Sequence, residues 1–150
     1  MRRLWVTRDI DASVDRAWDV LTDLDLWPEW GPSVRAAELD DGASGLALGA
    51  SGHVVTALGV RLPFRITAWN DGSAAPAGSA RDTSHRDGTR SWSWSWRVAG
   101  VGATDHTVEP LGAHRCRVGF GVPLAAAPYL AVCRVALARI DRLAVGRPSP

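Results

Sequence analysis

Serine and tryptophan alternate along residues 91–96, in the order Ser-Trp-Ser-Trp-Ser-Trp. Successive side chains of a strand point to opposite faces, so Trp92, Trp94 and Trp96 share one face with Val98. The serine face should meet water, and we therefore expect the tryptophans to point inward. Two interpretations stay open: the indoles pack as core, or they form a flat aromatic wall for a planar or polyene ligand, with N–H donors at its edge.

His106 is the residue best suited to proton transfer. It shares a strand face with Thr104 and Val108, opposite Asp105 and Glu109, so it points inward if Val108 does. A half-buried imidazole with a pKa near neutrality would move a proton in an aldol or dehydration step. The alternative is a structural histidine, hydrogen-bonded to a neighbouring strand or helix.

Three more side chains have a chemistry that an interior site could use. Arg8 shares a face with Val6 and Ile10, so we expect it to project inward, where it needs an acidic partner or a ligand carboxylate or enolate. Tyr129 precedes an apolar helical pattern, where its phenol either donates to a ligand carbonyl or packs with its hydroxyl at a rim. Cys133 lies on the apolar face of that pattern, where a thiol behaves as a small hydrophobe.

Composition excludes several classes of protein. The chain has 150 residues, enough for one core, and a formal net charge of +1, so no strong field attracts nucleic acid or an anionic membrane. It has no lysine, which excludes a lysine-dependent Schiff-base mechanism. Two cysteines, Cys116 and Cys133, make no disulfide framework, and the longest apolar run, 124–133, is too short to cross a bilayer. We expect a cytoplasmic protein without membrane insertion.

Known motifs for other chemistries are missing from the sequence. It contains no G-x-S-x-G nucleophile elbow, phosphate loop or dinucleotide fingerprint. The four histidines lack the spacing of metal ligands. Basic residues do not form a stripe with interleaved aromatics, so a nucleic-acid partner is not expected. We expect neither a metal nor a cofactor.

The elements that position these residues follow from hydrophobic periodicity. Residues 4–10 alternate as a strand, and a helix then begins at an N-cap, Ser13. Pro28 and Gly31-Pro32 limit residues 27–30 to a short helical turn. Six strands follow, in an antiparallel meander with the N-terminal strand at an edge: 34–39, 52–58, 60–69, 91–98, 103–109 and 115–122.

A long helix is predicted from Leu124 to Val145, roughly 20 residues and about 30 Å. It is the only large helix available to cover the apolar face of the sheet. Residues 70–90 lack hydrophobic periodicity and are rich in small and polar residues, so we expect an exposed, mobile loop. This loop is either a lid or a tolerated insertion.

Three stretches together resemble a known superfamily. They are residues 10–23 (IDASVDRAWDVLTD), Trp27-Pro28-Glu29-Trp30, and residues 103–110 (ATDHTVEP). In this order of elements the chain resembles the helix-grip superfamily, also called START-like or SRPBCC, and within it the bacterial polyketide cyclase/dehydrase and lipid-transport branch. The resemblance implies one α+β domain over residues 1–150, with a seven-stranded curved antiparallel sheet around a long C-terminal helix and two short helices after the first strand.

The resemblance also implies an internal hydrophobic cavity for a small hydrophobic or aromatic ligand. The side chains expected to line it are Trp92, Trp94, Trp96, Trp30, Phe64, Val108, Phe120 and Cys133. The function it favours is a polyketide cyclase or dehydratase that confines a flexible chain, with His106, Arg8 and Tyr129 as catalytic groups. The alternatives are a non-catalytic carrier or sensor of a lipid, terpenoid or aromatic metabolite, and an interaction module. Both a monomer and a homodimer are compatible with the sequence.

Overall fold

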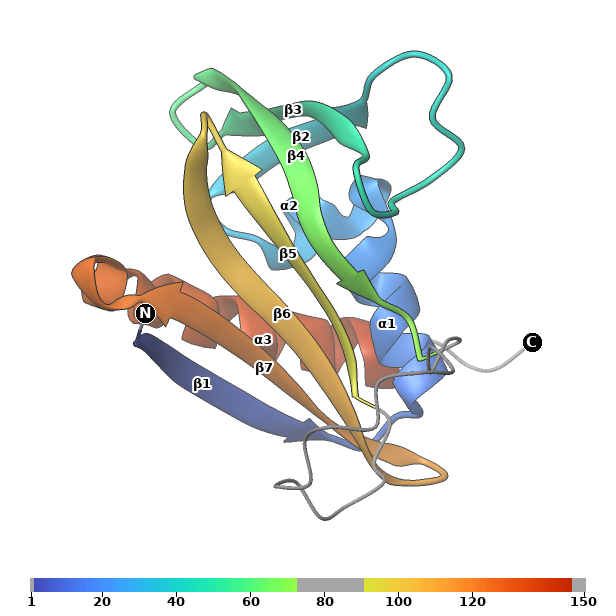
Figure 1. The fold of residues 1–150 in the computed structure, drawn as a ribbon. Coiled ribbons are helices and arrows are strands. Elements are labelled where there is room, and N and C mark those ends of the chain that lie inside the picture. The colour runs from blue at the N-terminus through green and yellow to red at the C-terminus, as the bar shows by residue number, and fades with distance from the viewer. Residues whose placement is uncertain (1, 73–90, 147–150) are drawn as a thin grey trace, which may run out of the picture.

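A computed structural model describes residues 2–72 and 91–146, so most of the loop predicted at 70–90 lies outside the described residues. The strands form one antiparallel sheet in the order β1-β7-β6-β5-β4-β3-β2 (Figure 1). Their bounds are β1 Arg3–Ile10, β2 Val34–Leu39, β3 Ser51–Thr56, β4 Arg61–Asn70, β5 Trp92–Val98, β6 Val101–Gly112 and β7 Arg115–Pro123. The predicted meander, with the N-terminal strand at one edge, is confirmed.

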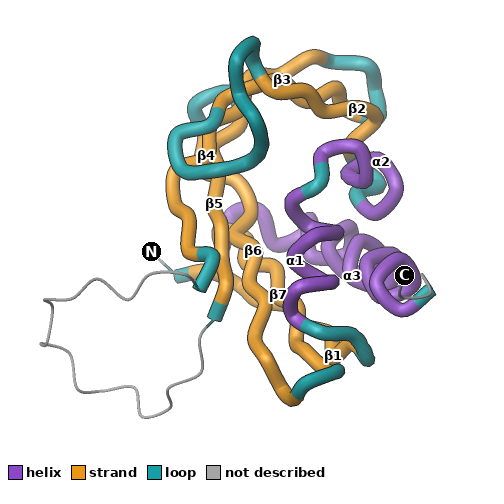
Figure 2. The backbone as a smooth tube through the Cα atoms, turned by 90° about the vertical axis from the view of Figure 1, so that its right-hand side faces the viewer, coloured by secondary structure: helices purple, strands orange, loops and turns teal. Residues whose placement is uncertain are grey.

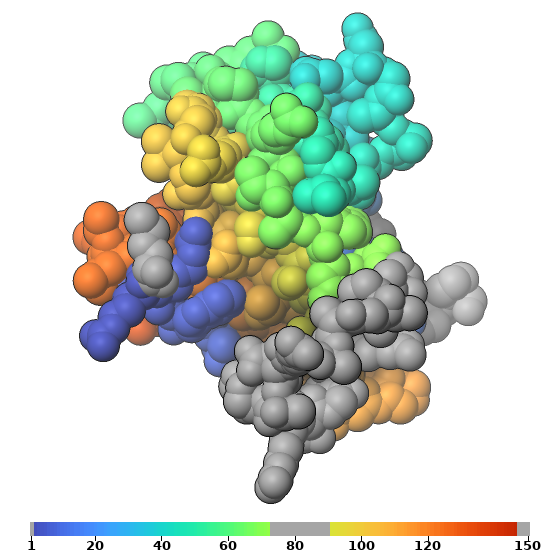
Figure 3. All heavy atoms as spheres, viewed as in Figure 1, coloured from blue at the N-terminus to red at the C-terminus, as the bar shows by residue number. Residues whose placement is uncertain are grey.

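All helices lie on the concave side of the sheet (Figure 2), and the opposite, outer face carries side chains of β1, β4, β5 and β6 (Figure 3). The cross-strand register brings the predicted site residues together. Trp94 of β5 pairs with His106 of β6, which pairs in turn with Phe120 of β7. An irregularity between Ser95 and Arg97 does not reverse the face of Trp96, which contacts Trp94 and His106 on the concave side.

The two short helices are locked to each other by tryptophan hydrogen bonds. Helix α1 (Val14–Thr22) begins at Ser13, whose hydroxyl accepts from the Arg16 amide, and α2 (Trp27–Trp30) has Pro28 in its first turn. The Trp27 Nε1 donates to the Leu21 carbonyl and the Trp30 Nε1 to the Val20 carbonyl, each at 3.0 Å. These carbonyls belong to the last turn of α1, where a helix lacks its own donors, so the indoles complete the helix and fix α2 against it.

The C-terminal helix is shorter than predicted. Residues Leu124–Tyr129 form a 3-10 segment, η2, and the α-helix α3 spans Leu130–Val145. Pro128 has no N–H to continue an α-helix, and Ala126 has non-helical angles (φ −102°, ψ 22°). The 16 residues of α3 extend about 24 Å. Its buried face carries Cys133, Ala136, Leu137, Ile140 and Ala144 and packs against β1, α1 and α2.

The hairpin between β3 and β4 also differs from the prediction. The strand expected to run to Leu58 ends at Thr56, because Gly59 adopts φ +84° and turns the chain. Leu58 is 92% exposed in this turn. The turn therefore presents an apolar side chain at one end of the molecule, beside the site described next.

Candidate functional site

Two cavities of very different size lie on the concave side of the sheet, within the part of the chain that the structure describes. The outer cavity has a volume of about 770 Å³ and is open to solvent, and the inner cavity has about 30 Å³. A void of 30 Å³ is large enough for a water molecule but too small for an organic ligand. The outer cavity falls within the 300–1,000 Å³ typical of small-molecule sites. It is therefore the candidate functional site.

Three uncharged segments surround the outer cavity. They are the β3–β4 hairpin tip (residues 56–60), the β5–β6 hairpin tip (98–102), and the end of β7 with η2 (123–129). The lining residues are Ser33, Val34, Val54, Thr56, Ala57, Leu58, Val60, Leu62, Trp96, Val98, Val101, Gly102, Ala103, Thr104, Val122, Pro123, Ala125, Ala126 and Tyr129. None of these described residues carries a charge.

The inner cavity is small because aromatic rings fill the space around it. We call this group the aromatic cluster: Trp27, Trp30, Phe64, Trp94, Trp96, His106 and Phe120. Trp94 lies between two rings, stacked on His106 at 3.7 Å and on Trp27 at 5.6 Å between centroids. The other pairs meet edge-on or tilted, the arrangements that aromatic quadrupoles favour. The cluster is therefore packed core over most of its surface.

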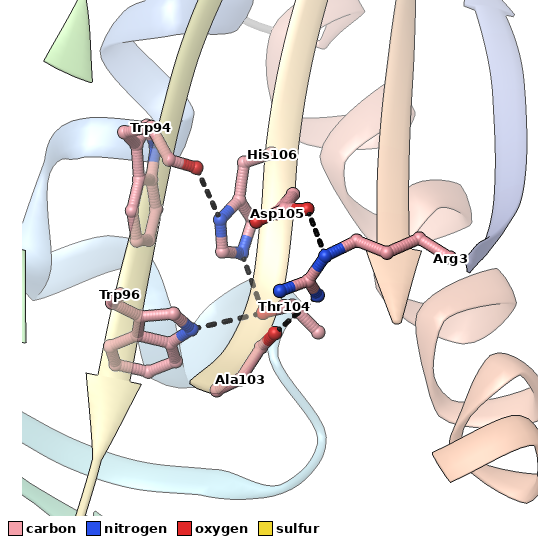
Figure 4. A network of polar contacts seen from close by, with 7 residues as sticks. All are labelled: Arg3, Trp94, Trp96, Ala103, Thr104, Asp105 and His106. Atoms are coloured by element: carbon pink, nitrogen blue, oxygen red, sulfur yellow. Dashed lines mark hydrogen bonds and ion pairs between the residues drawn. The ribbon is translucent and has the colours of Figure 1, made fainter. Parts of the chain in front are cut away.

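Both ring nitrogens of His106 have a polar contact with a neighbouring residue (Figure 4). Its Nδ1 lies 3.3 Å from the Trp94 carbonyl and its Nε2 lies 3.1 Å from the Thr104 hydroxyl. A carbonyl only accepts, so Nδ1 carries the proton; Nε2 then accepts from Thr104, whose oxygen accepts from Trp96 Nε1 at 3.0 Å. The donor and the acceptor of each of these three hydrogen bonds are therefore fixed.

Burial lowers the pKa of His106 from 6.5 to about 3, although its hydrogen bond to the Trp94 carbonyl partly opposes this shift. The side chain is 2% exposed. The prediction that His106 points inward is correct, but the prediction of a half-buried imidazole titrating near neutrality is wrong, because burial among aromatic rings disfavours its charged form. At neutral pH it is a hydrogen-bonding residue that orients Thr104.

Arg8 does not project into a cavity, and that prediction is wrong. Its Nε donates to Asp141 Oδ2 of α3 at 2.7 Å, and its side chain is 47% exposed. The strand face was assigned correctly, since Val6 and Ile10 pack inward. However, β1 is an edge strand, and a long side chain there reaches water beside α3 instead of the interior.

Tyr129 lies where the sequence placed it, at the start of α3, and it lines both cavities. Its hydroxyl lies 2.6 Å from the Ser33 Oγ, so the two side chains join η2 to the segment before β2. Burial raises the pKa of the phenol, and the hydrogen bond with Ser33 offsets part of that rise. The phenol is therefore protonated at neutral pH and able to act as a hydrogen-bond donor.

The residues predicted to contact ligand fall into three groups. Trp96 lines both cavities, whereas Trp30, Trp94, Phe120 and Cys133 line only the inner one. The residues Trp92, Phe64 and Val108 line neither, which corrects their predicted place at the cavity wall.

Each of these three corrections has a packing reason. Trp92 contacts Trp18 edge-on at 5.9 Å, in a separate aromatic group toward the other end of β5. Phe64 lies against Trp27 and Trp96, at centroid distances of 5.7 and 5.6 Å, and is therefore covered by them. Val108 is fully buried, at 0% exposure, in the core.

Most of the outer lining was not predicted from the sequence. Val34, Leu62, Val98 and Val122 were assigned to strands without a site role, and the alanines of η2 were assigned to the helix. A usable signal was present: residues 56–60, 98–102 and 123–129 contain no charged side chain. Apolar turns are unusual at a protein surface, so their shared lack of charge indicates a common apolar opening.

The described residues contain no group of three or more potential metal ligands. Burial raises the pKa of both Cys116 and Cys133 to about 11, so neither thiol is activated as a nucleophile. No described helix combines the length and hydropathy needed to cross a membrane.

The architecture defines the class of protein: a curved antiparallel sheet around a C-terminal helix, with two short helices after β1 and a cavity between sheet and helix, is the helix-grip fold. The sequence matches the family "Polyketide cyclase / dehydrase and lipid transport" over residues 1–144, and the chain belongs to that family. No curated protein matches the chain significantly.

Solved structures similar to this chain share its fold at low sequence identity. Protein MLL2253 from Mesorhizobium loti is 15% identical with a TM-score of 0.61, over 99% of this chain and 100% of that one. The di-domain ARO/CYC BexL of the BE-7585A biosynthetic pathway is also 15% identical, with a TM-score of 0.61, and the match covers 99% of this chain and 48% of BexL. DynU16, from the dynemicin biosynthetic locus, is 20% identical with a TM-score of 0.55, over 97% of this chain and 48% of that one.

Proposed function

We propose that the protein binds a lipophilic small molecule in the outer cavity. The observation that carries this proposal is an open cavity of about 770 Å³ whose described lining has no charge. Burial of apolar ligand surface against such a wall contributes about 25 cal/mol per Å² before the costs of association are subtracted. The walls are anchored in the sheet, so the site is largely preformed and little ordering is needed on binding.

The position of the titratable groups favours binding over acid–base catalysis. His106 lies behind Thr104 with a pKa of about 3, and Arg8 is engaged with Asp141 outside the cavity. Tyr129 is the one titratable side chain among the described residues that line the outer cavity. A carrier or sensor needs no proton donor, so the geometry supports this function best.

Cyclisation or dehydration of a bound polyketide-like chain is the second candidate. Family membership supports it, together with the fold shared with BexL and DynU16, and so does the Tyr129 hydroxyl at the cavity wall. Confinement would bring reacting carbons together, and the phenol would donate to a carbonyl oxygen as charge develops there. In this mechanism Tyr129 is the catalytic residue and His106 is a structural one.

A cavity-filling variant tests the binding proposal. Nile red, a neutral lipophilic dye, should bind the protein with increased fluorescence and be displaced by lipophilic competitors. Ala126→Phe, in the half-buried part of η2 that lines the cavity, should weaken dye binding at least about tenfold because the ring occupies ligand space.

Ala47→Phe is the matched control. It adds the same ring to an exposed residue between β2 and β3, away from the cavity lining, and should leave binding unchanged. Equal dye affinity in both variants would refute the assignment of the site. Product formation from a poly-β-ketone, slowed by Tyr129→Phe, would establish the second candidate in addition to binding.

A further inference from the structure

We infer that the outer cavity selects a neutral lipophile that carries a hydrogen-bond acceptor near one end, and that it admits carboxylic acids only in protonated form. This inference rests on the proposed function and specifies the ligand class of the same site. It follows from the lack of charged side chains in the described lining, and from which hydroxyl and indole protons are already donated in hydrogen bonds.

The cavity offers no counter-charge for an anionic ligand. No described lining residue is charged, and Arg35 and Arg97, which neighbour lining residues in the chain, are exposed and do not line the cavity. Arg61, which follows Val60, pairs with Glu38 at 2.5 Å. Arg3 pairs with Asp105 at 2.7 Å and donates to the Ala103 carbonyl at 2.9 Å (Figure 4). A carboxylate inside this cavity would lose its hydration without gaining a partner, which is strongly unfavourable.

The polar side chains deeper in the cavity have no proton left for a ligand. Trp96 Nε1 donates to Thr104, and the Thr104 hydroxyl donates to His106 Nε2. His106 cannot release that hydroxyl by becoming protonated near neutral pH, because its pKa is about 3. The inner end of the outer cavity therefore presents apolar surface and hydrogen bonds that are already satisfied.

A cluster of three hydroxyls near the start of β2 retains free donors. We call Ser33, Thr56 and Tyr129 the hydroxyl cluster. Ser33 and Tyr129 share one hydrogen bond at 2.6 Å, so one of their two protons remains free. The Thr56 oxygen accepts from the Val60 amide at 3.2 Å, which leaves its proton free as well.

The backbone places these hydroxyls together on one side of the cavity. The Ala57 amide donates to the Ser33 carbonyl at 3.0 Å, so Thr56 and Ser33 lie on adjacent parts of β3 and the segment before β2. All three residues line the cavity. A ligand carbonyl, ester or hydroxyl oxygen at this cluster leaves the hydrocarbon part of the molecule against Trp96, Val98 and Val122.

Three ligands of equal chain length test the inference: decanol, methyl decanoate and decanoic acid, each measured by displacement of Nile red between pH 5.5 and 7.5. The alcohol and the ester should bind with pH-independent affinity. The apparent affinity of the acid should fall about tenfold for each pH unit above its own pKa, because only the protonated form enters. Strong, pH-independent binding of decanoate would overturn the inference and leave the proposed function intact.

Two variants identify the hydroxyl cluster as the anchor. Tyr129→Phe combined with Ser33→Ala removes the shared donor and should weaken decanol binding about three- to tenfold, while decane binding stays unchanged. Thr56→Lys places a cation in the cavity and should create decanoate binding at pH 7.5 that Leu48→Lys, in an exposed loop, does not. Equal loss of decanol and decane would contradict the anchor. Failure of Nile red and all three ligands to bind would remove both the inference and the proposed function.

Discussion

The two ends of the space under the sheet contain the same kinds of strand but opposite kinds of packing. At one end the aromatic cluster leaves only about 30 Å³, and at the other about 770 Å³ remains open. The difference lies in side-chain size: Trp, Phe and His rings from α2, β4, β5, β6 and β7 interlock at the inner end, whereas Val and Ala dominate the lining of the outer end. An inward-facing tryptophan therefore does not by itself indicate a ligand wall, because large rings also fill space.

The aromatic cluster also links the sheet to the short helices. Trp27 contacts Trp30, Phe64, Trp94 and Trp96 at centroid distances of 5.3 to 6.4 Å. Through its hydrogen bond to Leu21 it joins α1 to β4 and β5. The cluster thus packs beside the outer cavity, and Trp96 belongs to the cluster and also lines that cavity.

The largest expected contrast between the two ends is in stability. Trp27→Ala removes a side chain that is 1% exposed and should lower the free energy of unfolding by about 3–5 kcal/mol, because it leaves a cavity and an unpaired carbonyl. Val60→Ala, at the outer cavity where the residue is 52% exposed, should change it by less than about 0.5 kcal/mol. Urea denaturation followed by circular dichroism measures both. Similar values would show that the inner end is not the packed core.

A smaller change in the free energy of unfolding is expected when the pH is lowered. The pKa of His106 is about 3 in the folded protein and near 6.5 when unfolded, so the unfolded chain takes up a proton first as the pH falls. The contribution of the neutral His106 to the free energy of unfolding is therefore fully present well above pH 6.5 and is lost progressively as the pH falls from 6.5 toward 3. Between pH 7.5 and 5.0 this residue alone should cost about 2 kcal/mol.

His106→Phe provides the control, because it keeps a ring on Trp94 but does not titrate. Its free energy of unfolding should lose most of the pH dependence between 7.5 and 5.0, whatever its absolute stability. An unchanged pH dependence in the variant would contradict the assignment of a buried, neutral imidazole.

The smallest expected effect is a difference in stability between variants of the two stacked tryptophans, Trp27 and Trp94. Trp94 and Trp27 are each 1% exposed, but the Trp94 Nε1 has no hydrogen-bond partner in the described structure, whereas the Trp27 Nε1 donates to Leu21. Trp27→Phe should therefore destabilise the protein by about 1–2 kcal/mol more than Trp94→Phe. Thermal unfolding of the two variants measures the difference. An equal loss would indicate that the Trp94 donor is satisfied, for example by water in the inner cavity.

The fold was accessible from the sequence because local signals agreed with the tertiary structure. Alternation predicted the strands, Ser13 and Pro28 predicted the helix starts, and the order of elements predicted the sheet. The error at the C-terminal helix came from Pro128: an apolar run reads as continuous helix, although the backbone there is 3-10 as far as Tyr129.

The site was only partly accessible, for a different reason. Strand period assigns a side chain to a face, and this placed Trp94, Trp96 and His106 on the concave side. It does not say how far along the sheet the space is filled, and Phe64, Trp92 and Val108 were placed at a cavity wall that lies elsewhere. Arg8 shows the same limit. Its strand face was predicted correctly, but it lies on the edge strand β1, where its side chain pairs with Asp141 instead of entering a cavity.

The sequence by itself determined the order of strands and helices and the inward face of the Ser-Trp repeat. It also determined that residues 56–60, 98–102 and 123–129 carry no charge. These properties depend on residues close together in the chain. The tertiary structure decided where the void lies, which hydroxyls keep a free proton, and that His106 stays neutral. These properties depend on neighbours from distant segments: the pKa of His106 reflects rings from α2, β5 and β7, and the open volume reflects what η2, β3 and β5 leave unfilled.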